Sequence, residues 1–322
     1  MSAPDVVVDR PHPLLLDALT EAGFDATGAR FTPLRSGTDS LPFAAITRSR
    51  DELVVKVRRA GSRSRYASAA WASTRMRAAG IPAARILWHS IEACVETRCQ
   101  GSPIEAEPLQ PQDLDAAIRA GEVLRRLHAI EVSSFGQLDG HGVGQHSTIQ
   151  GWFLALPSSR TPRLDDPDLN RLLNRARFTL EAGAGRLPRA TPKLLHGDWV
   201  GRHLFTDGQH ITGVVDLESV RGGDPLAELA GWSLREPALM TQALLTGYFD
   251  GPFPAESLLP LVLFRLRIAV SLLHFHASCD DQGMVRLRAA QIQADLDDLD
   301  HGHLTAVPRI APDPHTSGRR RP

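Results

Sequence analysis

The sequence predicts an α+β protein in which a small strand-rich N-terminal region precedes a larger, mainly helical C-terminal region. Short extended runs separated by turn residues dominate residues 31–97, whereas most segments between 113 and 299 have apolar residues at helical spacing. A Gln-Gly-Ser-Pro break at 100–103 separates the two patterns and suits a hinge. We therefore expect an N-terminal lobe over 1–99, a C-terminal lobe over 100–307 and a disordered tail over 308–322.

The composition indicates a soluble globular protein and gives little sign of other classes. The chain has 322 residues, of which 42% are hydrophobic and 23% charged, and its net charge is −1. A charge so near zero gives no argument for nucleic acid or a membrane surface as partner. The longest apolar run, 258–275, contains Arg265, Arg267 and His274, so we interpret it as a buried helix. Three cysteines without a disulfide framework and an N-terminus without a signal segment predict a cytoplasmic protein. We expect a monomer or a homodimer.

The N-terminal region is expected to hold one small sheet with two helices. Apolar spacing after Pro13 predicts an entry helix before residue 30, and Ser64 to Ala79 predicts a second helix, which Gly80 and Pro82 end. Strands are expected at 31–34, 43–47, 53–57, 85–89 and 93–97.

The C-terminal region is expected to consist of helices around one hairpin. Residues 131–150, rich in Gly and His, are expected to form a loop. A turn signal at 206–209 between two extended runs predicts the hairpin. Helices are expected at 113–130, 169–184, 225–249, 260–277 and 284–299.

The hairpin region carries the strongest functional signal in the chain. Asp198 follows one short apolar run, and Asp216 ends another, from Ile211 to Val215. A hairpin of this kind can bring two loop carboxylates into one cleft. One carboxylate can then orient a hydroxyl while the other holds a metal ion on a phosphate, which is the division of roles in phosphoryl transfer.

Three tripeptides in order resemble the aminoglycoside phosphotransferase family: His-Gly-Asp at 196–198, Asp-Leu-Glu at 216–218 and Gly-Asp-Pro at 223–225. The resemblance covers roughly residues 20–300. It implies a bilobal protein-kinase-like fold and transfer of a γ-phosphate from ATP or GTP, with Mg²⁺, to a hydroxyl of a small molecule. The acceptor would be an antibiotic such as an aminoglycoside, as in resistance, or a related metabolite.

The resemblance assigns roles to the carboxylates of this region. Asp198 would orient the acceptor hydroxyl and help to deprotonate it. Asp216 would bind the metal, and Glu218 would be either a further metal ligand or an ordinary loop acid. The family has an asparagine ligand where this chain has His203, a poor ligand for Mg²⁺ but a fair one for Mn²⁺. His203 is thus either a metal ligand or a packed histidine.

The N-terminal region would bind the nucleotide. Lys56, one of two lysines in the chain, matches the family lysine that contacts the α- and β-phosphates. The family pairs that lysine with a glutamate on the next helix, but residues 61–80 contain no acid. The turn with Ser36, Gly37 and Thr38 would cover the phosphates. The expected hinge contacts to adenine come from the backbone of Glu96, Thr97 and Arg98.

Charge along the chain bears on the acceptor. Residues 1–100 are net basic, which suits a triphosphate, and residues 241–300 are net acidic, which suits a cationic acceptor. The alternative interpretation of these acids is a set of solvated faces, with Asp295, Asp297, Asp298 and Asp300 among them. The departures at His203 and in residues 61–80 leave one alternative function, a pseudokinase-like protein that binds nucleotide or ligand with little transfer. A metal-dependent hydrolase is the least favoured hypothesis.

Overall fold

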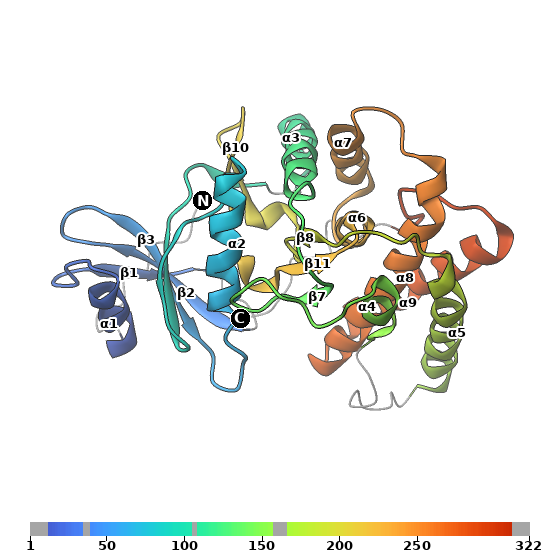
Figure 1. The fold of residues 1–322 in the computed structure, drawn as a ribbon, viewed down its shortest axis with the longest axis horizontal. Coiled ribbons are helices and arrows are strands. Elements are labelled where there is room, and N and C mark those ends of the chain that lie inside the picture. The colour runs from blue at the N-terminus through green and yellow to red at the C-terminus, as the bar shows by residue number, and fades with distance from the viewer. Residues whose placement is uncertain (1–11, 35–38, 105–107, 157–165, 311–322) are drawn as a thin grey trace.

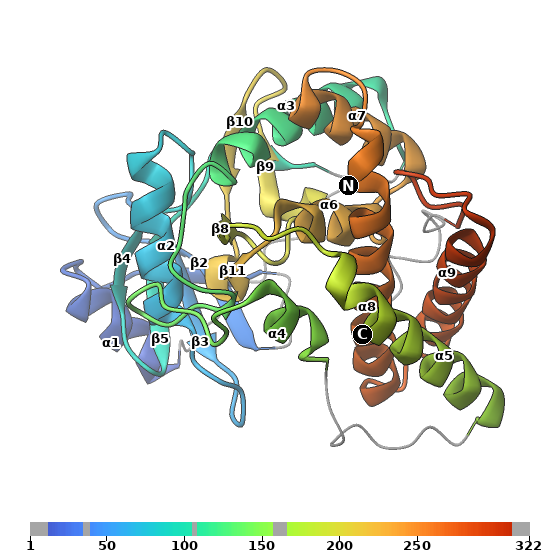
Figure 2. The same ribbon diagram turned by 45° about the vertical axis from the view of Figure 1, so that its right-hand side comes forward.

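The computed structural model describes residues 12–34, 39–104, 108–156 and 166–310. It divides into a small lobe built on an antiparallel sheet and a larger, mainly helical lobe (Figures 1 and 2). This is the α+β, two-lobed architecture that the sequence predicts.

The small lobe contains a five-stranded antiparallel sheet with the order β1-β2-β3-β5-β4. All five expected strands are present, and each lies within a few residues of its predicted position. They are β1 (Arg30–Pro33), β2 (Ser40–Ile46), β3 (Glu52–Arg58), β4 (Ile86–His89) and β5 (Ala93–Thr97).

Strand alternation gives this sheet two different faces. Leu53 and Val55 of β3 and Val95 of β5 pack against helix α1 (Pro13–Glu21) in an apolar core. The intervening residues point the other way, toward helix α2 (Tyr66–Ala78), which lies across the sheet from α1 (Figure 1). The alternation that buries the valines therefore also directs Lys56 to this inner face.

Two small sheets and two single-turn segments connect the lobes and carry the loops of the large lobe. Val214 exchanges backbone hydrogen bonds with Pro82 and Ala84, both at 2.9 Å, and so joins the hairpin to the small lobe. The strands are β6 (Ser102–Pro103), β7 (Gly136–Gln137), β8 (Lys193–Leu195), β9 (Leu204–Thr206), β10 (Ile211–Val214) and β11 (Arg221–Gly223). The single turns within this region are η2 (Gly201–His203) and η3 (Leu217–Ser219), with η1 (Ala184–Arg186) further back.

Helices form the rest of the large lobe around one core. Helix α3 lies beside α7, and α8 runs through the middle against α6, α9 and α5 (Figure 2). The helices are α3 (Pro111–Leu127), α4 (Ile149–Leu154), α5 (Pro167–Gly183), α6 (Pro225–Ser233), α7 (Ala238–Phe249), α8 (Leu258–Ser278) and α9 (Gln282–His301), with the single turn η4 (Ala255–Ser257) before α8.

Three details differ from the expected elements. The helix expected over 225–249 is two helices, because Pro237 cannot donate an amide hydrogen within a continuous helix. The loop expected over 131–150 contains the short strand β7 and the start of α4. Residues 308–310 fall in the expected disordered tail, yet Pro308 is buried and the carbonyl of Ile310 accepts a hydrogen bond from Gln291.

Helix α8 is long and apolar enough to span a membrane by length and composition. It is instead a core helix, since most of its side chains are buried within the protein, including two arginines. Arg265 is bonded to Asp295, and Arg267 donates to the carbonyls of Trp152 and Phe153. Charged groups bonded in this way belong to a protein interior, as the sequence predicts for this segment.

Candidate functional site

The loop between β8 and β9 carries Asp198, and two buried glutamates hold its backbone in place. Glu228 of α6 accepts hydrogen bonds from the amides of His196 and Gly197, both at 2.7 Å. Glu236, just beyond α6, accepts one from Gly201 at 2.8 Å. Glu228 fixes the amides at the start of the loop and Glu236 fixes an amide near its end, so the segment that carries Asp198 is held in one conformation.

Glycine at position 197 is required by the shape of this loop. Its φ is +82°, a left-handed conformation, and an added Cβ would lie 2.0 Å from the carbonyl oxygen of Ser219. The close approach brings the loop against η3, so the segments that carry Asp198 and Asp216 are packed together.

His196 connects two loops through its ring. Its Nε2 donates to the carbonyl of Val215 at 2.9 Å, and its Nδ1 accepts from the amide of Asp198 at 3.2 Å. The ring is fully buried, so it connects the two loops and has no access to a substrate.

Two arginines surround the Asp198 carboxylate. Arg235 Nη1 pairs with Oδ1, and Arg202 Nη2 lies 3.2 Å from Oδ2. Burial would raise the pKa of Asp198, but Arg235, His203, Arg202 and His196 together lower it to about 2. The carboxylate is therefore ionised and held in one orientation near neutral pH.

His203 lies between the two aspartates. Its Nδ1 is 2.9 Å from the carbonyl oxygen of Asp198, which can only accept, so Nδ1 carries the hydrogen. Burial lowers the pKa of His203 to about 4, although Asp216 and Asp198 oppose this, and the ring is neutral. The Nε2 lone pair then faces Asp216 Oδ2 at 3.3 Å.

Asp216 follows β10 in the left-handed region, with φ 65° and ψ 51°. This conformation is uncommon for a residue with a side chain, and it ends the extended run, so that Glu218 lies on η3 rather than on a strand. Ligand atoms of Asp198, His203 and Asp216 all lie within 4.8 Å of one another, close enough to share one metal ion.

Lys56 reaches this region from β3 and contacts three carboxylates. Its Nζ lies 3.0 Å from Glu218 Oε1, 3.3 Å from Glu96 Oε1 and 3.6 Å from Asp216 Oδ1. Burial would lower the pKa of Lys56, but Glu218, Glu96 and Asp216 raise it well above its usual value. The lysine is charged, and the group as a whole carries excess negative charge.

Burial and neighbouring charges also shift the pKa values of the carboxylates around Lys56. Burial raises the pKa of Glu218 to about 7, with Asp216 and Glu96 adding to the effect and Lys56 opposing it. Burial would also raise the pKa of Asp216, but Lys56 and His203 hold it well below its usual range. Asp216 thus keeps its charge while Glu218 takes up a proton near neutral pH.

The three residues expected at the hinge, Glu96, Thr97 and Arg98, make different contacts. The amides of Thr97 and Arg98 donate within the lobe, to the carbonyls of Arg85 at 2.9 Å and Glu52 at 3.4 Å. Glu96 turns its side chain to the inner face, where it is buried against Lys56. The expected phosphate turn, with Ser36, Gly37 and Thr38, lies outside the described residues.

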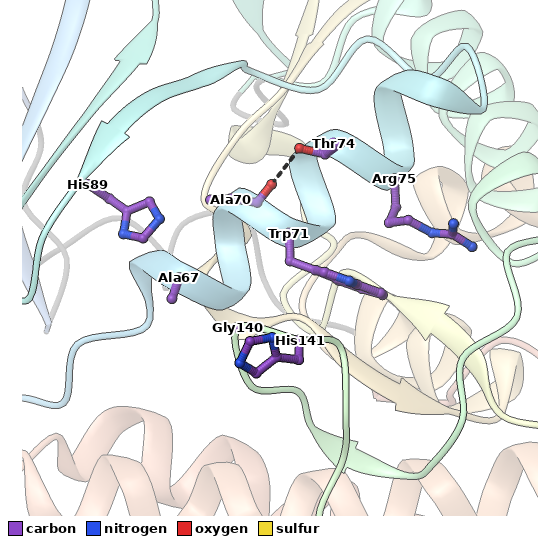
Figure 3. A pocket seen from close by; sticks show the side chains of 8 residues that line it. All are labelled: Ala67, Ala70, Trp71, Thr74, Arg75, His89, Gly140 and His141. Carbon is purple, nitrogen blue, oxygen red and sulfur yellow. Dashed lines mark hydrogen bonds between the residues drawn. The ribbon is translucent and has the colours of Figure 1, made fainter.

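A surface pocket of about 540 Å³ lies along helix α2, on a different face from the one that is buried in the protein (Figure 3). Trp71, Arg75, His89 and His141 are among the side chains that surround it. The face of α2 that packs inward is formed by other residues, such as Ala69 and Ala72. This pocket is therefore separate from the group around Lys56.

The acids near the C-terminus are engaged in ion pairs within the fold. Asp295 is buried against Arg265, and Asp298 pairs with Arg309. Asp297 and Asp300 face Arg175 of α5, at 3.6 and 2.6 Å. Asp295 and Asp298 are thus buried rather than solvated, and these four acids give no support to a cationic acceptor.

Four residues of the site escape prediction from the sequence: Arg202, Glu228, Arg235 and Glu236. Glu228 leaves the clearest trace, because an acid within the apolar run of α6 predicts a buried carboxylate with a specific partner. The other three lie in loops, where an arginine or a glutamate has no distinguishing pattern.

Comparison with known proteins agrees with these motifs. The model of the phosphotransferase enzyme family matches residues 30–258. No curated protein matches the chain.

Several solved structures share the fold. The aminoglycoside phosphotransferase APH(4)-Ia is 19% identical with a TM-score of 0.73, covering 88% of this chain and 97% of its own. A choline/ethanolamine kinase family protein from Mesorhizobium loti is 19% identical with a TM-score of 0.60, covering 86% and 91%. The macrolide 2'-phosphotransferase MphH from Brachybacterium faecium is 17% identical with a TM-score of 0.53, covering 86% and 96%.

A thermostable mutant of APH(4)-Ia has also been solved in a ternary complex with AMP-PNP and hygromycin B; it is 21% identical, with a TM-score of 0.71 over 83% of this chain and 93% of its own. The family match covers most of the chain and includes all three motifs. The chain therefore belongs to the phosphotransferase enzyme family and is a phosphotransferase, as its motifs predict.

Proposed function

We propose that this protein transfers the γ-phosphate of ATP or GTP to a hydroxyl group of a small molecule. One observation carries the proposal: three segments of the chain bring Lys56, the pair Asp198 and His203, and Asp216 together in one space between the lobes. Phosphoryl transfer needs such a set, with a cation for the phosphates, carboxylate ligands for a metal and a carboxylate for the acceptor hydroxyl.

The nucleotide would bind along the inner face of the small lobe. Lys56 would contact the α- and β-phosphates, and the backbone of Ser36, Gly37 and Thr38 would cover them. The amides of Thr97 and Arg98 already donate hydrogen bonds within the lobe. We therefore propose that adenine contacts backbone carbonyl groups of residues 96–98. Nucleotide complexes of structural relatives support this part of the proposal.

The donor set fits a divalent cation. A neutral Nε2 of His203 facing an ionised Asp216 oxygen at 3.3 Å brings two electron-rich atoms together. Adjacent ligands of an octahedral ion with bonds of 2.0–2.1 Å are about 3 Å apart, so a shared cation would relieve this contact. Asp216 and His203 would hold Mg²⁺ or Mn²⁺ with help from Glu218, and the charge of the phosphates would be neutralised there.

Asp198 would orient the acceptor hydroxyl and accept its proton as transfer proceeds. The two glutamates that fix its loop support this role, because a positioned base must be held within hydrogen-bonding reach of its substrate. Arg235 and Arg202 keep the carboxylate ionised, and on acceptor binding at least one of them would give up its place.

The acceptor would be a hydroxylated small molecule, such as an aminoglycoside or another antibiotic, or a related metabolite, and resistance is one role it would serve. Structural relatives that act on macrolides or bind hygromycin B support this class. We further propose a cytoplasmic protein, monomeric or homodimeric, without nucleic acid or membrane partners.

A second candidate function is binding of nucleotide or ligand with little transfer. The arginine contacts to both carboxylate oxygens of Asp198 favour it, since they occupy the atoms that an acceptor hydroxyl must reach.

A radiolabelled phosphate-transfer screen separates the two functions. Wild type and Asp198→Asn would be assayed against a panel of hydroxylated antibiotics and metabolites, with ATP and GTP, and with Mg²⁺ and Mn²⁺. Transfer by the wild type that Asp198→Asn lacks supports the kinase. Nucleotide binding without transfer to any acceptor would support the binding protein.

A further inference from the structure

Helix α2 offers no acid to Lys56. Its sequence contains no aspartate or glutamate, and its buried positions include Ala69 and Ala72. A buried lysine without a partner would lose its charge or be displaced from its site. Lys56 is nevertheless buried, and three carboxylates from other elements surround its ammonium group, so its position depends on acids outside α2.

The strand register identifies one such acid. Lys56 of β3 lies directly opposite Cys94 of β5, and Glu96 is the next residue of β5 on the same face. Diagonal neighbours of this kind lie within reach of long side chains. The Glu96 carboxylate accordingly lies 3.3 Å from Lys56 Nζ, within the rigid part of the sheet.

The three acids around Lys56 differ in exposure. The side chain of Glu96 is 5% exposed, that of Glu218 is 17% and that of Asp216 is 44%. Asp216 and Glu218 lie on the segment that would bind the metal, whereas Glu96 lies on the sheet and is the most buried of the three acids. If a metal ion engaged Asp216 and Glu218, as proposed above, Glu96 would remain as the partner of the lysine from within the protein.

We propose that Glu96 is the positioning residue of Lys56, and that β5 supplies the anchoring carboxylate that α2 lacks. The inference rests on the proposed function, because the lysine it positions is the one that would contact the nucleotide phosphates. Glu96 acts through Lys56 and has no contact with the reacting groups.

The test measures nucleotide binding directly, with a fluorescent ATP analogue and no acceptor. Glu96→Gln keeps the shape of the side chain and removes its charge, so we expect affinity to fall about ten- to a hundredfold, the range for one charge-assisted hydrogen bond. The matched control is Glu92→Gln, which removes an exposed acid that pairs with Arg58 at the start of the same strand. We expect it to bind as the wild type does.

A double-mutant cycle shows whether Glu96 acts through the lysine. In a Lys56→Met background, Glu96→Gln should change affinity by less than about twofold, because the interaction is already absent. If Glu96→Gln does not fold, Glu96→Asp retains the charge but shortens the reach, and we expect it to weaken binding less than Lys56→Met does.

Three results would overturn the inference. The first is wild-type nucleotide affinity in folded Glu96→Gln or, if that variant does not fold, in Glu96→Asp. The second is an undiminished effect of Glu96→Gln on affinity in the Lys56→Met background. The third is a loss of affinity in Glu92→Gln equal to that in Glu96→Gln. Failure of the wild type itself to bind nucleotide would instead contradict the proposed function.

Discussion

The two halves of the site have opposite electrostatic characters. Around Lys56, three carboxylates share one cation, and burial with mutual repulsion raises the pKa of Glu218 to about 7. Around Asp198, two arginines share one carboxylate and lower its pKa to about 2. The first half has excess negative charge that a metal ion can neutralise. The second is already neutralised, so an acceptor must compete for its carboxylate.

The largest expected effect comes from removing the carboxylate of the second half. Asp198→Asn or Asp198→Ala should lower turnover about 10²–10⁴-fold, the contribution of a positioned base, while nucleotide affinity stays within a few-fold of the wild type. Turnover with an acceptor found in the screen and nucleotide binding would be measured side by side. More than a tenth of wild-type turnover in Asp198→Asn would show that the assigned role is wrong.

Lys56 tests the first half in the same way, with a smaller effect. Lys56→Ala should weaken nucleotide binding and lower turnover by about ten- to a hundredfold, since it removes a charge-assisted contact and leaves three buried acids unpaired. Lys56→Arg should not restore activity, because the guanidinium is larger and flat. Lys193→Arg, at the other lysine, serves as the control. Full activity of Lys56→Arg would exclude the lysine from the site.

The pH profile distinguishes Glu218 from His203. An unperturbed histidine would titrate near 6.5, but the pKa of His203 is about 4, whereas that of Glu218 is about 7. Metal-dependent turnover should therefore fall as the pH drops below about 7, when Glu218 takes up a proton. This acid limb should persist in His203→Asn and flatten in Glu218→Gln, in assays from about pH 5.5 to 8.5.

His203→Asn should also shift metal preference by several-fold, from Mn²⁺ toward Mg²⁺, because it replaces an imidazole with an oxygen ligand. Turnover at graded concentrations of each metal would show the shift. Identical metal preference in the two proteins would mean that His203 is a packing residue.

The smallest expected effect concerns Arg235. Arg235→Met should raise the pKa of Asp198 from about 2 toward its ordinary value of 3.8, since Arg235 is its strongest cationic neighbour. A lowered carboxyl pKa stabilises the fold above pH 3.8, and that stability is lost as the pH falls toward 2. The variant should show a smaller loss of unfolding free energy over this range than the wild type does. Carboxyl NMR titration checks the pKa directly, and an unchanged value would assign the shift to other groups.

Much of the fold follows from local patterns. Alternation in β3 and β5 and helical spacing beyond residue 110 are properties of neighbouring residues, so they can be predicted from one sequence. Pro237, which divides α6 from α7, is also a local signal, but the apolar spacing on either side of it predicts one continuous helix. The three motifs likewise locate Asp198 and Asp216 in the sequence.

The partners of those residues could not be predicted in the same way. Glu96 was expected to contribute its backbone, because strand alternation alone does not tell which face of β5 meets Lys56. Arg235 reaches Asp198 only because α6 ends beside the loop. Such contacts depend on how distant segments pack, and this information is not present in any short stretch of sequence.

The left-handed backbone of Asp216 has a consequence for how the protein can change by mutation. A non-glycine residue in this conformation costs on the order of 1–3 kcal/mol, and the charge of Asp216 also raises the pKa of Glu218 and Glu96 by repulsion. Glycine at this position would relieve both effects, offset in part by the greater freedom of the unfolded chain and by lost contacts to Lys56 and His203. Folding therefore acts on this carboxylate in both directions: backbone strain and repulsion oppose it, whereas the contacts that hold its pKa well below the usual range favour it. A glycine variant would therefore separate the two: its stability reports the balance of these terms, and its metal affinity reports the binding role that we propose for the carboxylate.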